Sequence, residues 1–342
     1  MTNIVRGLDQ DKYSAHLLVI APGGELLRSI PNHVDIIHLN NKRVSRSLFK
    51  LFKVIKNVKP QVIFSNMFHV NILTIATMLL LGNVGIKLII RETIIPSYTI
   101  TRSKYRQIYG FMLKVAYNSK AVSTIVCQGE YMKNDIVSRF NIIPDKIVVI
   151  NNPVDIHDIR LKSILPFNFH ISEATINLVL IARLEHIKGH DLLLEIFSGL
   201  PRGAYHLYIV GTGSMKTKIE SDIESRNLQG EVTLLGHQSN PYSLLKRMDL
   251  FLLTSRSDPF PNAVLEALSL GVPVIAFKTP GGIEEIMVPG MTGELVAPGD
   301  IRDYRAKILD YSREKHPRTK IKRYVELQYG KNILKKYDNI FS

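Results

Sequence analysis

Short apolar runs recur along the whole chain, and they constrain its fold more than any other feature of the sequence. The runs are rich in Val, Ile and Leu, and amphipathic helical patterns separate them. Such runs indicate parallel strands that helices cover on both faces. The predicted strands are 16–21, 34–39, 62–65, 87–91, 124–127, 146–151, 177–182, 206–210, 232–235, 250–254, 274–277 and 293–296. The sequence therefore predicts an α/β protein with doubly wound parallel sheets, which bind ligands at the carboxyl ends of their strands.

The series of strands is interrupted once, after the segment Asn151-Asn-Pro-Val-Asp155. From there to about Ser172 the sequence has no periodicity, and a second series begins at Asn177. A chain of 342 residues also exceeds the usual size of one hydrophobic core. We therefore expect a first domain over 1–153, a second domain over 154–325, and a C-terminal helix over 326–342 that packs back on the first domain.

The positive charge is concentrated in the first half of the chain. Residues 1–150 contain 20 Lys and Arg against 8 Asp and Glu, whereas the remaining residues contain 24 against 22. A basic half beside a nearly neutral half predicts an anionic partner for the first half, such as lipid headgroups, lipid pyrophosphates or nucleic acid. A solvated basic surface is the alternative. Nucleic acid is not expected, because no recognition motif accompanies the basic residues.

A basic amphipathic helix is predicted between Lys42 and Lys59. Its apolar stripe is expected to pack on the sheet, and its lysine row to attract the anionic surface of a membrane. The longest apolar stretch, near 72–81, is too short to span a bilayer, and residues 1–16 do not resemble a signal peptide. The single cysteine, Cys127, fits a buried thiol in a reducing compartment. We expect a cytosolic protein in peripheral contact with the membrane.

Two loops in the second half place cations and glycines after predicted strands. Arg183 and Lys188 follow the strand that ends at 182, and they suit a diphosphate because arginine offers a planar fork and lysine a mobile point charge. Taken alone, two exposed loop cations are the simpler interpretation. Gly211 lies in Ile209-Val-Gly-Thr-Gly-Ser214, where a tight turn explains a single Gly-x-Gly equally well.

A third segment, Ser257–Ala276, contains a loop and the start of a predicted helix, with one carboxylate on each side of that helix start. Asp258 and Glu266 flank a first turn whose amides attract phosphate groups. Carboxylates there can accept hydrogen bonds from sugar and ribose hydroxyls. Since prolines lack an N–H, the free donors at this helix start are expected to be the amides of Asn262, Ala263 and Val264. The arrangement suits a nucleotide-linked sugar.

Together these motifs resemble those of the retaining glycosyltransferases of family 4, which have the GT-B fold. Alanine replaces the glycine of the first motif, and Asp258 replaces the first glutamate of the paired-glutamate motif. The matching segments are Ala182-Arg-Leu184, Lys188-Gly189, Asp258-Pro-Phe-Pro261, Leu265-Glu-Ala267, Gly281-Gly-Ile-Glu-Glu-Ile286 and Gly290-Met-Thr-Gly293.

The resemblance implies two Rossmann-like domains facing a cleft, and a role for each matching residue. Arg183 and Lys188 would neutralise the diphosphate of a UDP- or GDP-type donor, and Asp258 would hold a hydroxyl of its sugar. Glu266 would bind the ribose, and the loop beginning at Gly236-His237 would receive the base. No metal and no cofactor are expected, because the cations take the part of a metal ion.

The resemblance assigns the acceptor to the first domain. His69, Arg91 and Glu92 follow predicted strands and would face a lipid-linked or nascent polysaccharide acceptor of cell-surface glycan synthesis. Relatives open with an apolar strand and a Gly-Gly loop, whereas this sequence opens as if within the helix that follows them. We therefore expect the first domain to lack its first strand and the chain to have low intrinsic activity.

Two other functions fit the same motifs. One is a non-catalytic subunit of a glycan assembly complex that binds a sugar nucleotide or a partner. The other is a sugar-nucleotide epimerase built on the same pair of domains.

Overall fold

The chain forms two compact units, which are described here separately. The computed structural model describes residues 2–21, 27, 30–82, 85–100, 103–167, 169, 171–312, 316–330 and 332–342. Unit 1 comprises Met1–Pro153 and Lys331–Ser342, and unit 2 comprises Val154–Gly330. The segment that returns to unit 1 was expected to begin at residue 326, but it begins at residue 331. Residues 326–329 belong instead to α14 (Arg318–Tyr329), which packs against α11 (Asn262–Ser269) in unit 2.

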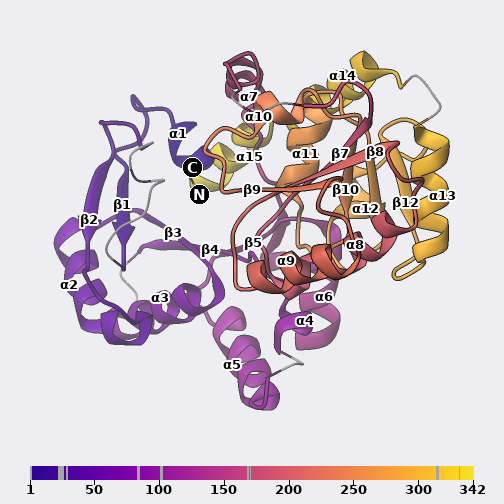
Figure 1. The fold of residues 1–342 in the computed structure, drawn as a ribbon. Coiled ribbons are helices and arrows are strands. Elements are labelled where there is room, and N and C mark those ends of the chain that lie inside the picture. The colour runs from indigo at the N-terminus through magenta and orange to yellow at the C-terminus, as the bar shows by residue number, and fades with distance from the viewer. Residues whose placement is uncertain are drawn as a thin grey trace. The chain divides into compact units, whose positions relative to one another are not determined.

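Unit 1 contains two parallel sheets with helices packed on them (Figure 1). One sheet pairs β1 with β2, and the other has the order β3-β4-β5-β6. Its elements are α1 (Thr2–Arg6), β1 (His16–Val19), β2 (Asp35–His38), η2 (Val44–Ser47), α2 (Leu48–Val58), β3 (Val62–Asn66), α3 (Phe68–Leu81), β4 (Lys87–Arg91), α4 (Pro96–Ile100), α5 (Arg106–Asn118), β5 (Thr124–Cys127), α6 (Glu130–Phe140), η3 (Pro144–Lys146), β6 (Ile147–Val149) and α15 (Asn332–Phe341).

The two sheets of unit 1 share a helical layer although their strands do not pair. Leu18 of β1 and Ile20, which directly follows that strand, belong to the same hydrophobic cluster as Ile63 of β3. Leu51 and Ile55 of α2 are buried in that cluster, as expected for the apolar stripe of this helix. Among the described residues no strand joins β1 to β3, so the strands of unit 1 remain in two sheets.

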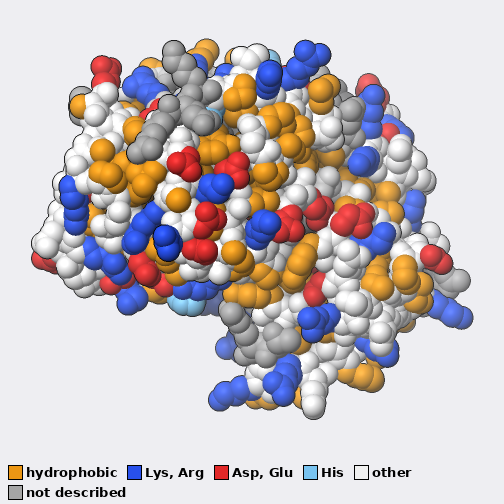
Figure 2. All heavy atoms as spheres, turned by 90° about the vertical axis from the view of Figure 1, so that its right-hand side faces the viewer, with side chains coloured by type: hydrophobic (Ala, Val, Ile, Leu, Met, Phe, Trp, Pro, Cys, Tyr) orange, Lys and Arg blue, Asp and Glu red, His pale blue; other side chains and the backbone are white. Residues whose placement is uncertain are grey.

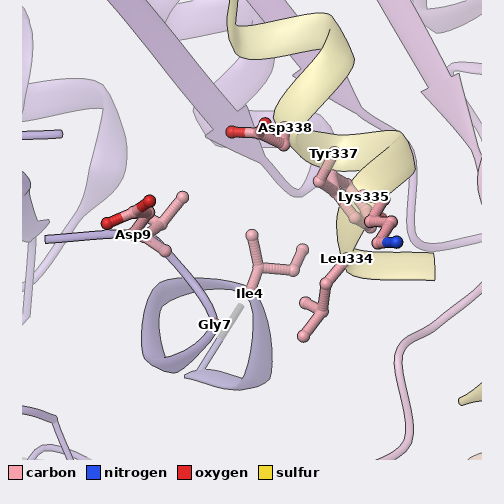
Figure 3. A pocket seen from close by; sticks show the side chains of 8 residues that line it. Ile4, Gly7, Asp9, Leu334, Lys335, Tyr337 and Asp338 are labelled. Atoms are coloured by element: carbon pink, nitrogen blue, oxygen red, sulfur yellow. The ribbon is translucent and has the colours of Figure 1, made fainter. Parts of the chain in front are cut away.

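Helix α15 completes unit 1 by covering the larger sheet. Ile333 and Tyr337 are buried with Ile4 of α1, Ile89 of β4 and Val126 of β5. Figure 3 shows α1 and α15 side by side around a cavity of about 180 Å³. The burial explains why a helix so far along the chain returns to the first unit.

Unit 2 is built on one six-stranded parallel sheet of order β12-β11-β10-β7-β8-β9. Its elements are α7 (Ile156–Lys162), β7 (Ile176–Ile181), η4 (His186–Lys188), α8 (His190–Ser198), β8 (Tyr205–Val210), α9 (Lys216–Ser225), β9 (Val232–Gly236), α10 (Tyr242–Leu245), β10 (Leu250–Leu253), α11, β11 (Val274–Phe277), α12 (Ile283–Ile286), β12 (Gly293–Val296), α13 (Ile301–Tyr311) and α14.

Both faces of this sheet are buried, which is why its strands read as continuous apolar runs. In β7, Val179 belongs to the hydrophobic cluster on one face, while Leu178 and Leu180 belong to the cluster on the other. In β10, Phe251 and Leu252 likewise point to opposite faces. Every predicted run of both units contains a strand, and the predicted doubly wound parallel architecture is confirmed.

Candidate functional site

The candidate site lies at the carboxyl edge of the sheet in unit 2. Strands β11, β10, β7 and β8 are consecutive neighbours and run parallel, so their carboxyl ends meet at one edge. The loops that follow them are 278–282, 254–261, 182–189 and 211–215. They contain four of the predicted donor-binding residues, which are Arg183, Lys188, Gly211 and Asp258.

Glycines lock these loops against one another. Gly211 has φ +145°, and a Cβ at this position would lie 1.9 Å from the carbonyl oxygen of Ala182. The neighbouring Leu184 N–H donates to the carbonyl oxygen of Thr212 at 2.9 Å. This close approach accounts for the glycine in the turn, and a contact between Gly211 and a donor remains a prediction.

Two further glycines fix the loops that carry Lys188 and Asp258. Gly189 has φ +69°, and a Cβ there would lie 2.0 Å from the carbonyl oxygen of Thr254. Gly281 has φ +134°, and a Cβ there would lie 1.6 Å from the carbonyl oxygen of Asp258. Neither position tolerates a side chain without movement of the backbone. The loops after β7, β10 and β11 are therefore held together by the backbone itself.

Lys188 and Asp258 form an ion pair across these loops. The Nζ atom of Lys188 lies 2.5 Å from Oδ2 of Asp258, and the two side chains are only 18% and 11% exposed. Both residues were expected to face the donor, and the structure brings them together as each other's partner. A charged pair with so little solvent access is strongly hydrogen-bonded, and it holds the two charges at the sheet edge.

Arg183 is the exposed cation of the same loop. Among the described residues, no side chain forms an ion pair or a hydrogen bond with its guanidinium. The nearby Glu185 instead accepts hydrogen bonds from the hydroxyl of Ser214 at 2.8 Å and from its N–H at 3.2 Å. These bonds from Ser214 lower the pKa of Glu185, and the charge of Arg183 contributes less.

Glu266 is a half-buried carboxyl group on α11. Within the described part of the chain, it has neither a hydrogen-bond donor nor a cation as partner. Loss of hydration raises the pKa of Glu266 to about 7. An acid left in this state is costly unless a donor reaches it.

The first turn of α11 offers fewer free amides than expected. Asn262 is exposed, Ala263 is half-buried and Val264 is buried. The N–H of Val264 donates to the carbonyl oxygen of Pro261 at 3.1 Å. The expectation that this amide is free was therefore wrong, because a tight turn at Pro261 already satisfies it.

The predicted base-binding loop follows β9. Gly236 ends this strand with φ +65°, and its carbonyl oxygen accepts a hydrogen bond from the Gly211 N–H at 2.8 Å. His237 is exposed next to it. Binding of a base by these two residues remains a prediction.

Sequence reasoning missed Arg256, which braces the loop around Lys188. Its guanidinium donates to both carboxylate oxygens of Asp191, at 2.9 and 2.6 Å, and to the carbonyl oxygen of His186 at 2.8 Å. The only signal in the sequence is its position two residues before Asp258. His190, two residues after Lys188, is buried, and this burial lowers its pKa to about 4, so its ring is neutral near pH 7.

The residues predicted to bind the acceptor have separate positions in unit 1. His69 is exposed at the second residue of α3. Arg91 and Glu92, at the end of β4, are buried. Arg91 donates to the side-chain oxygen of Asn152. The observed contacts of Arg91 and Glu92 are internal to the unit, and their contact with an acceptor remains a prediction.

Glu92 anchors a buried polar network. Its carboxylate accepts from the hydroxyl of Tyr117 at 2.6 Å and from the Thr93 N–H at 2.9 Å. Asn71 donates to the carbonyl oxygen of Arg91 at 3.0 Å, and Gln128 donates to that of Glu92 at 3.2 Å. Burial raises the pKa of Glu92. The network explains the polar side chains at the end of β4 without a ligand.

Family models match nearly the whole length of the chain. The model of the glycosyl transferases group 1 matches residues 164–328, and that of glycosyltransferase family 4 matches residues 1–158. The chain belongs to these glycosyltransferase families. Among the described residues of the chain, no helix is both long enough and apolar enough to span a bilayer. No cluster of three or more His, Cys, Asp or Glu suited to a metal ion occurs among the same residues.

Curated relatives of this chain include enzymes named for surface-glycan synthesis. It is 29% identical to an uncharacterized glycosyltransferase of Methanocaldococcus jannaschii, over 72% of this chain and 63% of that protein. It is 30% identical to a lipopolysaccharide 1,6-galactosyltransferase of Salmonella typhimurium, over 59% and 57% of the two chains. An N-acetylgalactosaminyltransferase of Campylobacter jejuni, which acts on a diphospho-undecaprenol-linked sugar, is 26% identical over 61% and 56%. The matches thus span less than two thirds of these relatives.

Solved structures show that the chain has the GT-B fold. Anabaena HepE in complex with UDP superposes with a TM-score of 0.78 at 17% identity, over 99% of this chain and 94% of that chain. Sucrose-phosphate synthase of Thermosynechococcus elongatus superposes with a TM-score of 0.79 at 16% identity, over 99% and 91%. The predicted GT-B class is confirmed.

Proposed function

We propose that this chain is a retaining glycosyltransferase that moves a sugar from a nucleoside diphosphate to a saccharide or lipid-linked acceptor of a cell-surface glycan. The observation that carries the proposal is the half-buried carboxyl of Glu266, which has no partner among the described residues, at a sheet edge that also holds Arg183 and the Lys188–Asp258 pair. Ribose hydroxyls would supply the missing donors. The named activities of the curated relatives support the same class of reaction.

In this proposal Arg183 and Lys188 bind the diphosphate. Arg183 is exposed without an ion-pair partner among the described residues. The ammonium group of Lys188 carries three donors, so it can maintain its ion pair with Asp258 and also donate to a phosphate oxygen. Asp258 accepts a hydrogen bond from a hydroxyl of the donor sugar with its remaining lone pairs. Both cations stabilise the charge that grows on the leaving phosphate.

The transfer step needs no protein nucleophile and no metal in this scheme. The bond between the anomeric carbon and the diphosphate oxygen breaks, and the acceptor oxygen bonds to the same face of that carbon. The acceptor proton passes to the leaving phosphate, so the products are the glycoside and the nucleoside diphosphate. The configuration at the anomeric carbon is retained.

Calorimetry with UDP and GDP tests the donor site. We expect Arg183→Ala and Glu266→Gln each to weaken binding by about tenfold or more, since each loses a charge or acceptor for the ligand. Arg247→Ala is the control, because Arg247 is an exposed arginine just before β10, at the opposite end of that strand from these loops. Equal affinities in the parent and in both site variants would overturn the site.

Transfer is tested with a lipid extract or oligosaccharide as acceptor and a UDP- or GDP-sugar as donor. Retention predicts a glycoside with the anomeric configuration of the donor, which NMR of the product reports. Donor binding without transfer to any acceptor would instead indicate the non-catalytic subunit considered above.

A further inference from the structure

Helix α5 presents an apolar stripe to solvent, which is a property that the proposed sugar transfer does not explain. One face of α5 is in the core, where Leu113 and Tyr117 are completely buried. The stripe lies outside that face and is exposed by 58% at Ile108, 67% at Phe111 and 54% at Val115. The helix thus carries apolar side chains on both faces, whereas a surface helix usually carries polar ones outside.

The spacing of the exposed residues makes the stripe continuous. Ile108, Phe111, Met112 and Val115 follow one another at the i, i+3, i+4 and i+7 positions of one helical face. Tyr105, directly before α5, is exposed as well. Figure 1 shows α5 projecting beyond α3 and α4 from unit 1. Five large exposed apolar side chains along little more than three turns mark an interaction surface.

The charged residues of α5 and of the segments that flank it in the sequence are all positive. Between Glu92 and Glu130 the sequence contains no Asp or Glu. The exposed cations of the described part of this interval are Lys104, Arg106, Lys114 and Lys120. In the lowest part of Figure 2, where α5 lies, Lys and Arg side chains stand beside hydrophobic ones. An apolar stripe flanked by cations matches the boundary between acyl chains and anionic headgroups.

The acidic residues on the elements packed against α5 are engaged on its core side or elsewhere. Glu92 accepts a hydrogen bond from the hydroxyl of Tyr117 at 2.6 Å on the buried face of α5, and two others are on α6. Asp135 accepts a hydrogen bond from the Ser97 N–H at 3.1 Å, and Glu130 lies 3.9 Å from Lys133. They therefore do not neutralise the cations of α5. A second copy of the chain is a poor partner for the stripe, because a two-fold contact would bring the same cations together.

We propose that α5 lies in the interface of a bilayer that contains anionic lipids, with Ile108, Phe111, Met112 and Val115 inserted among the acyl chains. Helix α2, for which the sequence suggested lipid contact, is not equivalent. Its apolar stripe is buried, and Phe49 is its single exposed large apolar side chain, beside a row of lysines. Helix α2 thus adds charge, and α5 supplies the apolar anchor.

The full chain contains no tryptophan, which allows a specific fluorescence test. Phe111→Trp places one indole in the stripe, and Leu327→Trp places one at an exposed leucine of α14 as the matched control. With vesicles of phosphatidylcholine and phosphatidylglycerol, we expect a blue shift of emission for the first variant only. No shift, or an equal shift with pure phosphatidylcholine, would overturn the proposal.

Sedimentation with the same vesicles measures affinity independently. Ile108→Ser combined with Phe111→Ser should lower binding by about tenfold or more, because two inserted side chains are lost. Leu161→Ser combined with Leu327→Ser is the control, since both leucines are exposed outside unit 1. Circular dichroism should show an unchanged melting temperature for both pairs. A blue shift that grows with protein concentration without vesicles would show self-association and would also overturn the proposal.

Discussion

Lys188 and Asp258 are 70 positions apart in the sequence, yet their side chains meet at 2.5 Å between the loops after β7 and β10. The pair is mostly withdrawn from water, so each charge depends on the other. Replacing one partner leaves the second without compensation, which costs more than the pair contributes as a whole.

We predict that Lys188→Ala and Asp258→Ala each lower the free energy of unfolding by about 1–3 kcal/mol, and that the double variant loses less than the sum. Urea denaturation of the four proteins measures this coupling. Additive losses would show that the pair is not coupled in solution.

Variants of Lys188 and Asp258 should also affect nucleotide binding and sugar transfer differently. Asp258→Asn should retain affinity for UDP or GDP, since Lys188 is still present, but should lower the rate of sugar transfer. Lys188→Ala should weaken both. Calorimetry and release of nucleoside diphosphate report the two properties. An Asp258→Asn variant that loses nucleotide affinity as strongly as Lys188→Ala would contradict the assigned roles.

The raised pKa of Glu266 predicts a pH dependence of stability. The pKa of Glu266 is about 7 in the folded chain, above the ordinary value of 4.5, so the folded state holds this proton more tightly. Its contribution is complete below pH 4.5 and is lost as the pH rises through 7. Glu266→Gln removes the loss, and the stability of the variant relative to the parent should therefore increase over this interval.

Denaturation series at several pH values measure the difference for Glu266→Gln. Hydroxyl donors favour the charged carboxylate, so we also expect UDP or GDP to bind the parent more tightly as the pH rises through 7, with release of a proton. Parallel stability curves for parent and variant would exclude a raised pKa at this position.

The strands could be predicted from sequence because burial on both faces leaves a direct signature in composition. Val179 and its neighbours face two different clusters, and both require apolar side chains. The loops at the sheet edge could be placed for the same reason, since parallel strands end on one side.

The contacts within the site could not be predicted, because they depend on which strands are neighbours. Lys188 meets Asp258 only because β7 lies beside β10, and Arg256 reaches Asp191 for the same reason. The prediction for the N–H of Val264 was wrong because the sequence shows which residues lack an N–H but not which amides a turn already satisfies. In the structure a turn bonds this amide to the carbonyl oxygen of Pro261. Family resemblance predicted the site residues, whereas the packing of the strands determines which of them contact one another.

The resemblance and its place after a strand led us to expect Glu92 at a ligand, whereas in the structure its carboxylate is buried and accepts a hydrogen bond from Tyr117. We predict that Tyr117→Phe lowers the free energy of unfolding by about 1–3 kcal/mol, because a buried carboxylate loses one of its donors. The loss should be larger at high pH, where the carboxyl with its raised pKa is charged, and smaller at low pH. Urea denaturation at two pH values tests this, and a loss independent of pH would contradict it.

The glycine at 281 sets the position of Asp258, and its replacement should affect both stability and transfer. Alanine at this position has a disfavoured φ of +134° and a Cβ 1.6 Å from the carbonyl oxygen of Asp258. Gly299 is the matched control, since its φ is +80° but no atom lies within 4 Å of a Cβ there. We expect Gly299→Ala to cost about 1 kcal/mol for the backbone alone, and Gly281→Ala to cost about 3 kcal/mol or more because the loop must also move. Thermal unfolding measures both costs, and sugar transfer should fall only in Gly281→Ala. Equal losses of stability would mean that the contact between Gly281 and Asp258 does not hold the loop in solution.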